Sequence, residues 1–171
     1  IEFTLGKTDL YNYLPFKLHG LLKAGGRLGI IVSNSWLGTE IGRKFFEALQ
    51  FYYQVQSVVI SNCKRWFENA DVVATLLVLQ RKEVSAPDEQ LHINFWMIHK
   101  DIKQIDADEK ETIISSIVLG EETDRAVNSC KRYSIEVIRK ITDKGISLNA
   151  LFHDVSWIDK LGECLIPIEK V

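Results

Sequence analysis

The hydrophobic and polar positions predict alternating helices and strands in the first half of the chain. Leucines three and four positions apart predict a helix over 9–23, in which Pro15 either kinks the helix or marks its true first turn. Gly25 and Gly26 end this helix, because glycine adopts positive φ without steric cost. The apolar run over 27–32 then predicts a strand that is covered on both faces, as in a parallel sheet.

One more helix and three more strands follow in the pattern. A stripe of apolar residues predicts a helix over 40–51, and β-branched and aromatic residues predict strands over 53–60 and 71–79. The loop over 61–70 is short, which favours antiparallel neighbours over a crossover pair. Residues 91–98 alternate polar and apolar at first and predict a half-exposed strand.

The second part of the chain has a different character. Residues 99–130 are rich in Asp and Glu and predict a solvated, acidic connector, and 133–144 predicts an amphipathic helix. The remaining residues have short apolar pieces without a clear period. We therefore divide the chain into an α/β unit over 1–98 and an acidic helical connector over 99–171.

Composition places the chain among ordinary globular proteins. Its 171 residues carry a net charge of −2, and neither half is basic enough to indicate nucleic-acid binding by charge alone. No apolar run approaches the roughly 20 residues that span a bilayer, and no signal peptide is seen. Cys63, Cys130 and Cys164 are widely spaced and odd in number, which argues against disulfides and a zinc site. We expect a cytoplasmic protein without a metal or a membrane partner.

The order and spacing of several segments resemble a known family. The matching segments are 6–11, 21–37 and 67–79, within a stretch over 5–82, and a weaker match continues through 133–155. Together they are similar to the C-terminal half of the catalytic domain of adenine-N6 DNA methyltransferases from restriction–modification and phage-defence systems. The resemblance implies a partial Rossmann-like, S-adenosylmethionine-dependent methyltransferase sheet with a C-terminal β-hairpin. A helical connector would then lead toward a target-recognition domain.

The resemblance also implies cofactor contacts near the start of the chain. Asp9, Leu10 and Tyr11 would border the S-adenosylmethionine pocket, and the side chains of Leu10 and Leu14 would face it. Simpler roles stay open for these residues. Asp9 is a good helix N-cap, and leucines on a helix are commonly core residues.

An aromatic platform is the main functional candidate that the resemblance supplies. In the family, an aromatic at the position of Phe67 stacks on the target adenine after the base leaves the duplex. Flipping a base costs a few kcal/mol, and stacking on an aromatic ring recovers roughly 1–3 kcal/mol. Trp66 is a second aromatic that competes for this role. A packed core position is the alternative for Phe67.

Candidate DNA contacts lie in two loops. The loop over 33–36 follows a predicted strand, where ligands collect in open α/β sheets, and it carries Asn34 and Trp36. Lys64 and Arg65 precede the aromatic platform and would contact phosphates. The alternatives are an asparagine that satisfies backbone groups and a solvated pair of basic residues.

Two motifs of the family are missing from this sequence. The polar-Pro-Pro-aromatic motif that holds the adenine amino group is absent, since Pro15, Pro87 and Pro167 are all unpaired. The glycine-rich loop that cradles the cofactor is absent as well. Both lie N-terminal in the usual order, and the chain starts at Ile1 without Met, so we expect it to be a piece of a longer protein. No catalytic residue is expected in this chain, which alone would bind S-adenosylmethionine weakly or not at all and be inactive.

The expected parent protein transfers a methyl group from S-adenosylmethionine to a flipped adenine in double-stranded DNA. A restriction subunit or a specificity subunit is a further expected partner. One alternative is a methyltransferase acting on an RNA or protein nitrogen, and another is a non-catalytic scaffold. A half sheet would expose an apolar edge, so self-association of the chain is also expected.

Overall fold

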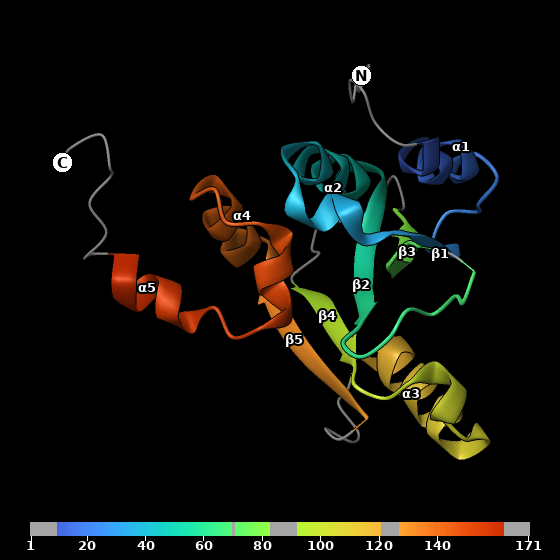
Figure 1. The fold of residues 1–171 in the computed structure, drawn as a ribbon. Helices are drawn as coiled ribbons and strands as arrows, with labels where there is room; N and C mark the ends of the chain where they lie inside the picture. Colours follow the sequence, from blue (N-terminus) through green and yellow to red (C-terminus); the bar gives the residue numbers. More distant parts are fainter. Residues whose placement is uncertain (1–9, 70, 83–91, 121–126, 163–171) are drawn as a thin grey trace.

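A five-stranded mixed sheet organises the chain (Figure 1). The computed structural model describes residues 10–69, 71–82, 92–120 and 127–162. The strands are β1 (Arg27–Ser33), β2 (Tyr53–Ser61), β3 (Ala74–Arg81), β4 (His92–Ile98) and β5 (Asn128–Ser134). They lie in the order β1-β3-β2-β4-β5.

The strand directions confirm the predicted α/β class. β3 is antiparallel to both β1 and β2, so the strands expected over 53–60 and 71–79 are antiparallel neighbours as predicted. β2 and β4 are parallel, and β5 is antiparallel to β4. The carboxyl ends of β2 and β4 therefore lie side by side, which brings the loops that follow these two strands together.

Five α-helices and four 3₁₀ turns accompany the strands in the described part of the chain. The helices are α1 (Leu14–His19), α2 (Glu40–Tyr52), α3 (Ala107–Leu119), α4 (Ile135–Asp143) and α5 (Ser156–Gly162). The turns are η1 (Leu10–Tyr13), η2 (Asn34–Gly38), η3 (Ile102–Gln104) and η4 (Leu148–Phe152). None of the described helices combines the length and the apolar character needed to cross a bilayer.

The region around Pro15 shows how proline starts a helix. The expected single helix over 9–23 is replaced by η1 and the shorter α1, with Pro15 in the first turn of α1. Proline fits there because the first turn has no intrahelical use for its missing N–H. Gly25 takes a φ of 69° in the turn before β1, as its position in the sequence predicted.

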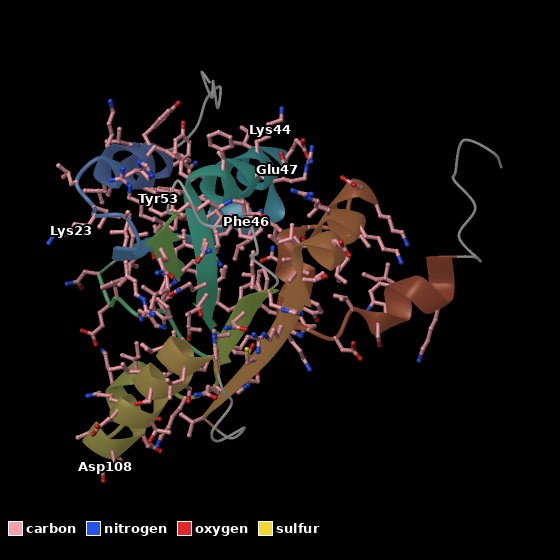
Figure 2. The ribbon with its side chains drawn as sticks, turned by 180° about the vertical axis from the view of Figure 1, so that it is seen from behind. Lys23, Lys44, Phe46, Glu47, Tyr53 and Asp108 are labelled. Carbon is pink, nitrogen blue, oxygen red and sulfur yellow. The ribbon has the colours of Figure 1, made fainter. Side chains whose placement is uncertain are left out.

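The larger hydrophobic core lies between one face of the sheet and α2, α4 and η4. Phe45, Phe46 and Leu49 of α2 are buried against it. Figure 2 shows Phe46 on the side of α2 that faces the sheet, with Lys44 and Glu47 on the outer side. Thr39 caps α2 by accepting a hydrogen bond from the Gly42 N–H, which fixes where the helix begins.

A second, smaller core lies on the opposite face, where α3 packs. Val59 of β2 and Trp96 and Ile98 of β4 point into it, together with Ile105 and Ile113. Neighbouring residues of β4 thus enter different cores, because side chains alternate along a strand. The expectation that this strand is half-exposed is wrong: Ile93 to Ile98 are mostly buried.

β1 differs from its prediction in the opposite way. The expectation of a strand covered on both faces, as in a parallel sheet, is wrong, because β1 is an outer strand that pairs antiparallel with β3. Ile30 and Val32 are buried in the larger core, whereas Ile31 between them is 51% exposed. A continuous apolar run therefore predicted the strand correctly but not its coverage.

β5 is an element that the hydrophobic pattern does not reveal. It begins within the stretch that we expected to be connector and pairs with β4 along its whole length. The sheet consequently continues across the expected division at residue 98, and Ile138 and Ile141 of α4 enter the larger core. The division into 1–98 and 99–171 stays a prediction.

Candidate functional site

An apolar hollow lies beyond the carboxyl end of β1. Its volume is about 570 Å³. The residues that line it come from η1, the end of β1, the start of β3 and the loop before β3: Leu10, Tyr11, Ile31, Val32, Ser33, Phe67, Val72 and Ala74. The strand end is where open α/β sheets collect ligands, so this hollow is the candidate site.

Hydrogen bonds join the three segments that meet at the hollow. The Tyr11 hydroxyl lies 2.8 Å from the Ser35 hydroxyl, which ties η1 to the loop after β1. The backbone N–H of Asn34 donates to the Val73 carbonyl at 2.8 Å, which ties this loop to the segment before β3. The lining is therefore built from residues far apart in sequence that are fixed relative to one another.

Phe67 lies at the rim of this hollow. Its side chain is 47% exposed, and Leu10, across the lining, is 86% exposed. Large apolar side chains exposed around a concave surface are typical of a binding site. The structure thus brings together Phe67, Leu10 and Tyr11, which the resemblance had placed in two neighbouring sites.

Two of the expected cofactor contacts, Leu14 and Asp9, are not among the described residues that line the hollow. Leu14 is 45% exposed at the start of α1 and is not among the lining residues. Asp9 lies outside the described residues. A cofactor role for either residue stays a prediction.

Trp66 and Phe67 are neighbours in sequence with different surroundings. Trp66 is half-buried and packs against the smaller core, the cluster that includes Val59 and Ile105. Phe67 points to the hollow instead. Of the two aromatics, only Phe67 therefore presents its ring at the candidate site in this structure.

Trp36 belongs to the core and not to a surface that DNA can reach. It is 2% exposed, lies stacked on Phe46 with 5.9 Å between ring centroids, and meets Phe45 edge to face. Its side chain could contact DNA only if the larger core unpacked, so the structure contradicts the expected contact. The aromatic character of the position reflects packing, since large rings fill the space under α2.

The basic residues of the loop after β2 are paired with carboxylates. Lys64 Nζ lies 3.0 Å from Asp101 Oδ2, and Arg65 Nη1 lies 2.6 Å from Asp71 Oδ1. The backbone N–H of Lys103 and the ammonium of Lys64 hold the pKa of Asp101 below its usual value. Lys64 and Arg65 remain well exposed, and both lie close to Phe67 in the chain.

Sequence reasoning missed several residues of the site. Ile31 and Val72 line the hollow, yet in the sequence they are ordinary members of apolar runs. Ile31 lies on the outer strand β1, and a single strand pattern does not encode the order of strands in the sheet. Asp101 lies 37 positions after Lys64, and only the parallel pairing of β2 with β4 brings the two together.

The fold is thus a mixed α/β sheet with an apolar hollow past one strand end, and three solved structures that share this fold are restriction–modification proteins. The chain matches the type IIG restriction endonuclease BpuSI with a TM-score of 0.58 and 10% identity, covering 84% of this chain and 16% of that one. It also matches a modification subunit assigned to a type I restriction enzyme of Vibrio vulnificus YJ016. The TM-score is 0.58 and the identity 16%, and the match covers 95% of this chain and 35% of that one.

A third match has the same character. The methyltransferase subunit of a type I restriction–modification system from Streptococcus thermophilus gives a TM-score of 0.54 and 19% identity, covering 80% of this chain and 29% of that one. Identities this low establish a shared fold. No protein-family model and no curated protein sequence matches the chain. The chain spans about a third or less of the length of these three structural neighbours.

Proposed function

We propose that this chain is the C-terminal half of the catalytic domain of an adenine-N6 DNA methyltransferase from a restriction–modification or phage-defence system. The neighbours with this fold, two of them named as modification or methyltransferase subunits, support the proposal. So does the ordered set of sequence segments that resembles the family. Its substrate is a flipped adenine in double-stranded DNA.

The position of Phe67 is the observation that carries this proposal. The ring is 47% exposed at the rim of an apolar hollow just past the end of β1. A base removed from the duplex loses its stacking partners, and an aromatic face replaces them at roughly 1–3 kcal/mol. A ring buried in either core would be unable to do this.

The lining residues fit the flat part of a nucleoside better than a charged group. Apart from Tyr11 and Ser33, the described lining side chains are hydrocarbon, and none carries a charge. S-adenosylmethionine, when bound, supplies the methyl group, and Leu10 and Tyr11 would contact its apolar part. The lining offers no counter-charge for an ammonium or a carboxylate, so we propose that this chain alone binds the cofactor weakly and transfers no methyl group.

The proposed role of this chain in the reaction is to position the adenine. Phe67 would hold the adenine by stacking, and the hydrocarbon of Ile31 and Val72 would exclude water from one side of the base. Orientation of two reactants accounts for a large part of a transfer rate when no covalent enzyme intermediate is needed. We place no residue of this chain in the proton or methyl transfer itself.

Lys64, Arg65 and Asn34 are the proposed DNA contacts. The two basic side chains flank the platform on its N-terminal side and are more than half exposed. An ammonium and a guanidinium have more N–H donors than one carboxylate takes up, so Lys64 and Arg65 would contact phosphate oxygens while still paired with Asp101 and Asp71. Such contacts fix orientation without reading sequence. A restriction or specificity subunit is the further partner that we propose. Cys63 and Cys130 are thiols and not a disulfide, which supports the proposal of a reducing, cytoplasmic compartment.

The identity of the methylated nucleoside tests this function. The gene product that carries these residues is incubated with S-adenosylmethionine and plasmid DNA, and the hydrolysed nucleosides are analysed by mass spectrometry. We expect N6-methyladenine, and the 171-residue chain assayed alone should give none. Methylated cytosine, methylation of RNA or protein in place of DNA, or transfer by the isolated chain would contradict the proposal.

A further inference from the structure

The loop that carries Phe67 lies against the segment after β4. Because β2 and β4 are parallel neighbours, residues 62–68 and 98–105 leave the sheet side by side. The Asn62 backbone N–H donates to the Ile98 carbonyl at 2.9 Å, and the Asn62 side-chain amide lies 3.1 Å from His99 Nδ1. The two segments are therefore in register from their first residues.

Two ion pairs continue this contact. Lys64 meets Asp101 at 3.0 Å, and Glu68 meets Lys103. The Asp101 side chain is only 14% exposed, and its carboxylate also accepts a hydrogen bond from the backbone N–H of Lys103. The carboxylate is therefore held in place independently of Lys64. A fixed partner lowers the side-chain entropy that an ion pair must overcome.

Trp66 makes the contact between the two ion pairs. It packs against the smaller core, which includes Ile98 and Ile105 of the same segment. The side chains of 62, 64, 66 and 68 thus all contact residues 98–105 or the core beside them. All side chains of 62–68 except the half-buried Trp66 are exposed, but the intervening ones face other parts of the molecule: Arg65 pairs with Asp71, and Phe67 lines the hollow.

We propose that residues 62, 64, 66 and 68 form an even-numbered clamp on 98–105, and that Asp101 and Lys103 are positioning residues which hold Phe67 outward at the hollow. The inference rests on the proposed function for the use of Phe67, but the clamp itself does not. If the loop over 62–68 moved by one residue relative to 98–105, Phe67 would face the core and Trp66 would face the hollow. The ion pairs at 64 and 68 disfavour that shift, since it would separate their charges.

Hydrogen–deuterium exchange measured by mass spectrometry on the gene product tests the clamp. In Asp101→Asn and Lys103→Gln, peptides within 62–69 should exchange about two- to fivefold faster, the range that exposed ion pairs give. Asparagine keeps the acceptor for the Lys103 N–H, so the change isolates the charge. Reversing both partners, Glu68→Lys with Lys103→Glu, should restore slow exchange.

Lys100→Gln is the matched control. Lys100 is next to Asp101 in the sequence, but its ion pair is with Glu109 of α3 at 2.6 Å and does not involve the loop over 62–68. Exchange of the 62–69 peptides should stay at the wild-type rate in this variant. Unchanged exchange in both Asp101→Asn and Lys103→Gln, or equal acceleration in Lys100→Gln, would overturn the clamp.

A stacking readout separates the positioning role from the clamp and from the proposed function. The fluorescence of 2-aminopurine in a single-stranded oligonucleotide should be quenched by the wild type, less by Asp101→Asn and by Lys103→Gln, and fully again by Glu68→Lys with Lys103→Glu, which remakes the pair that Lys103→Gln removes. Faster exchange with unchanged quenching would overturn the positioning role. No quenching by the wild type would contradict the proposed function, whereas the exchange data would still decide whether the clamp exists.

Discussion

Gly42 of α2 lies so close to the Trp36 carbonyl that a Cβ at position 42 would stand 1.6 Å from that oxygen. This approach lets the first turn of α2 pack directly on η2, and it seats Trp36 against Phe45 and Phe46. The loop after β1 therefore owes its path to a residue without a side chain. That path also fixes Ser35, the partner of Tyr11 at the candidate site.

Gly42→Ala should destabilise the protein by about 1–3 kcal/mol, because backbone must move to admit the methyl group. Gly29→Ala is the matched control, since a Cβ at position 29 meets nothing within 4 Å. Urea unfolding followed by circular dichroism measures both. An equal loss of stability in the two variants would contradict the close approach.

Tyr53→Phe should cost about 1 kcal/mol of stability. The Tyr53 hydroxyl is buried and donates to the Pro15 carbonyl at 2.6 Å, and burial raises its pKa to about 12. The change removes one buried hydrogen bond while the ring still fills its space. Urea unfolding at neutral pH measures the effect. Stability equal to that of the wild type would show that this bond does not hold α1 on β2.

His19 should make stability depend on pH. Burial, and then the positive charge of Arg81, lower the pKa of His19 below its ordinary 6.5. The unfolded chain therefore takes up more protons than the folded chain once the pH falls below about 6.5, and stability drops. His19→Gln should lose less stability than the wild type between pH 7.5 and pH 5.5. A larger loss in the variant would contradict the direction of this shift.

The outer strand β1 should support self-association of the 171-residue chain. Ile31 is 51% exposed on β1, which is at one end of the strand order. Sedimentation over a range of concentrations should show a dimer or larger species, and Ile31→Lys should shift it toward monomer. A wild-type chain that remains monomeric at all concentrations would rule the prediction out.

The sequence predicted the elements that have a clear local pattern of apolar and turn residues. The strand over 27–32 and the helix over 40–51 were found because apolar runs are bounded by turn or capping residues, Gly25 and Thr39. β5 was missed because its residues, from Asn128 to Ser134, are mostly polar. Its strand character comes from pairing with β4.

The candidate site was predictable only in part. Phe67 and Tyr11 were identified because each lies in a segment that resembles a known family. Trp36 was misplaced because a tryptophan in a loop looks the same in sequence whether it is buried or exposed. The ion pairs of Asp101 and Lys103 with the Phe67 loop depend on sheet order, which no local pattern contains.

Stacking of a base on Phe67 is the most direct test of the whole account. The gene product is titrated into a single-stranded oligonucleotide containing 2-aminopurine, and fluorescence is followed for wild type, Phe67→Ala, Phe67→Tyr and Val73→Ala. The wild type and Phe67→Tyr should quench the base. Phe67→Ala should weaken binding about tenfold and abolish quenching. Val73, exposed but outside the lining, serves as the control. Equal quenching by Phe67→Ala and wild type would contradict the aromatic platform and the function built on it.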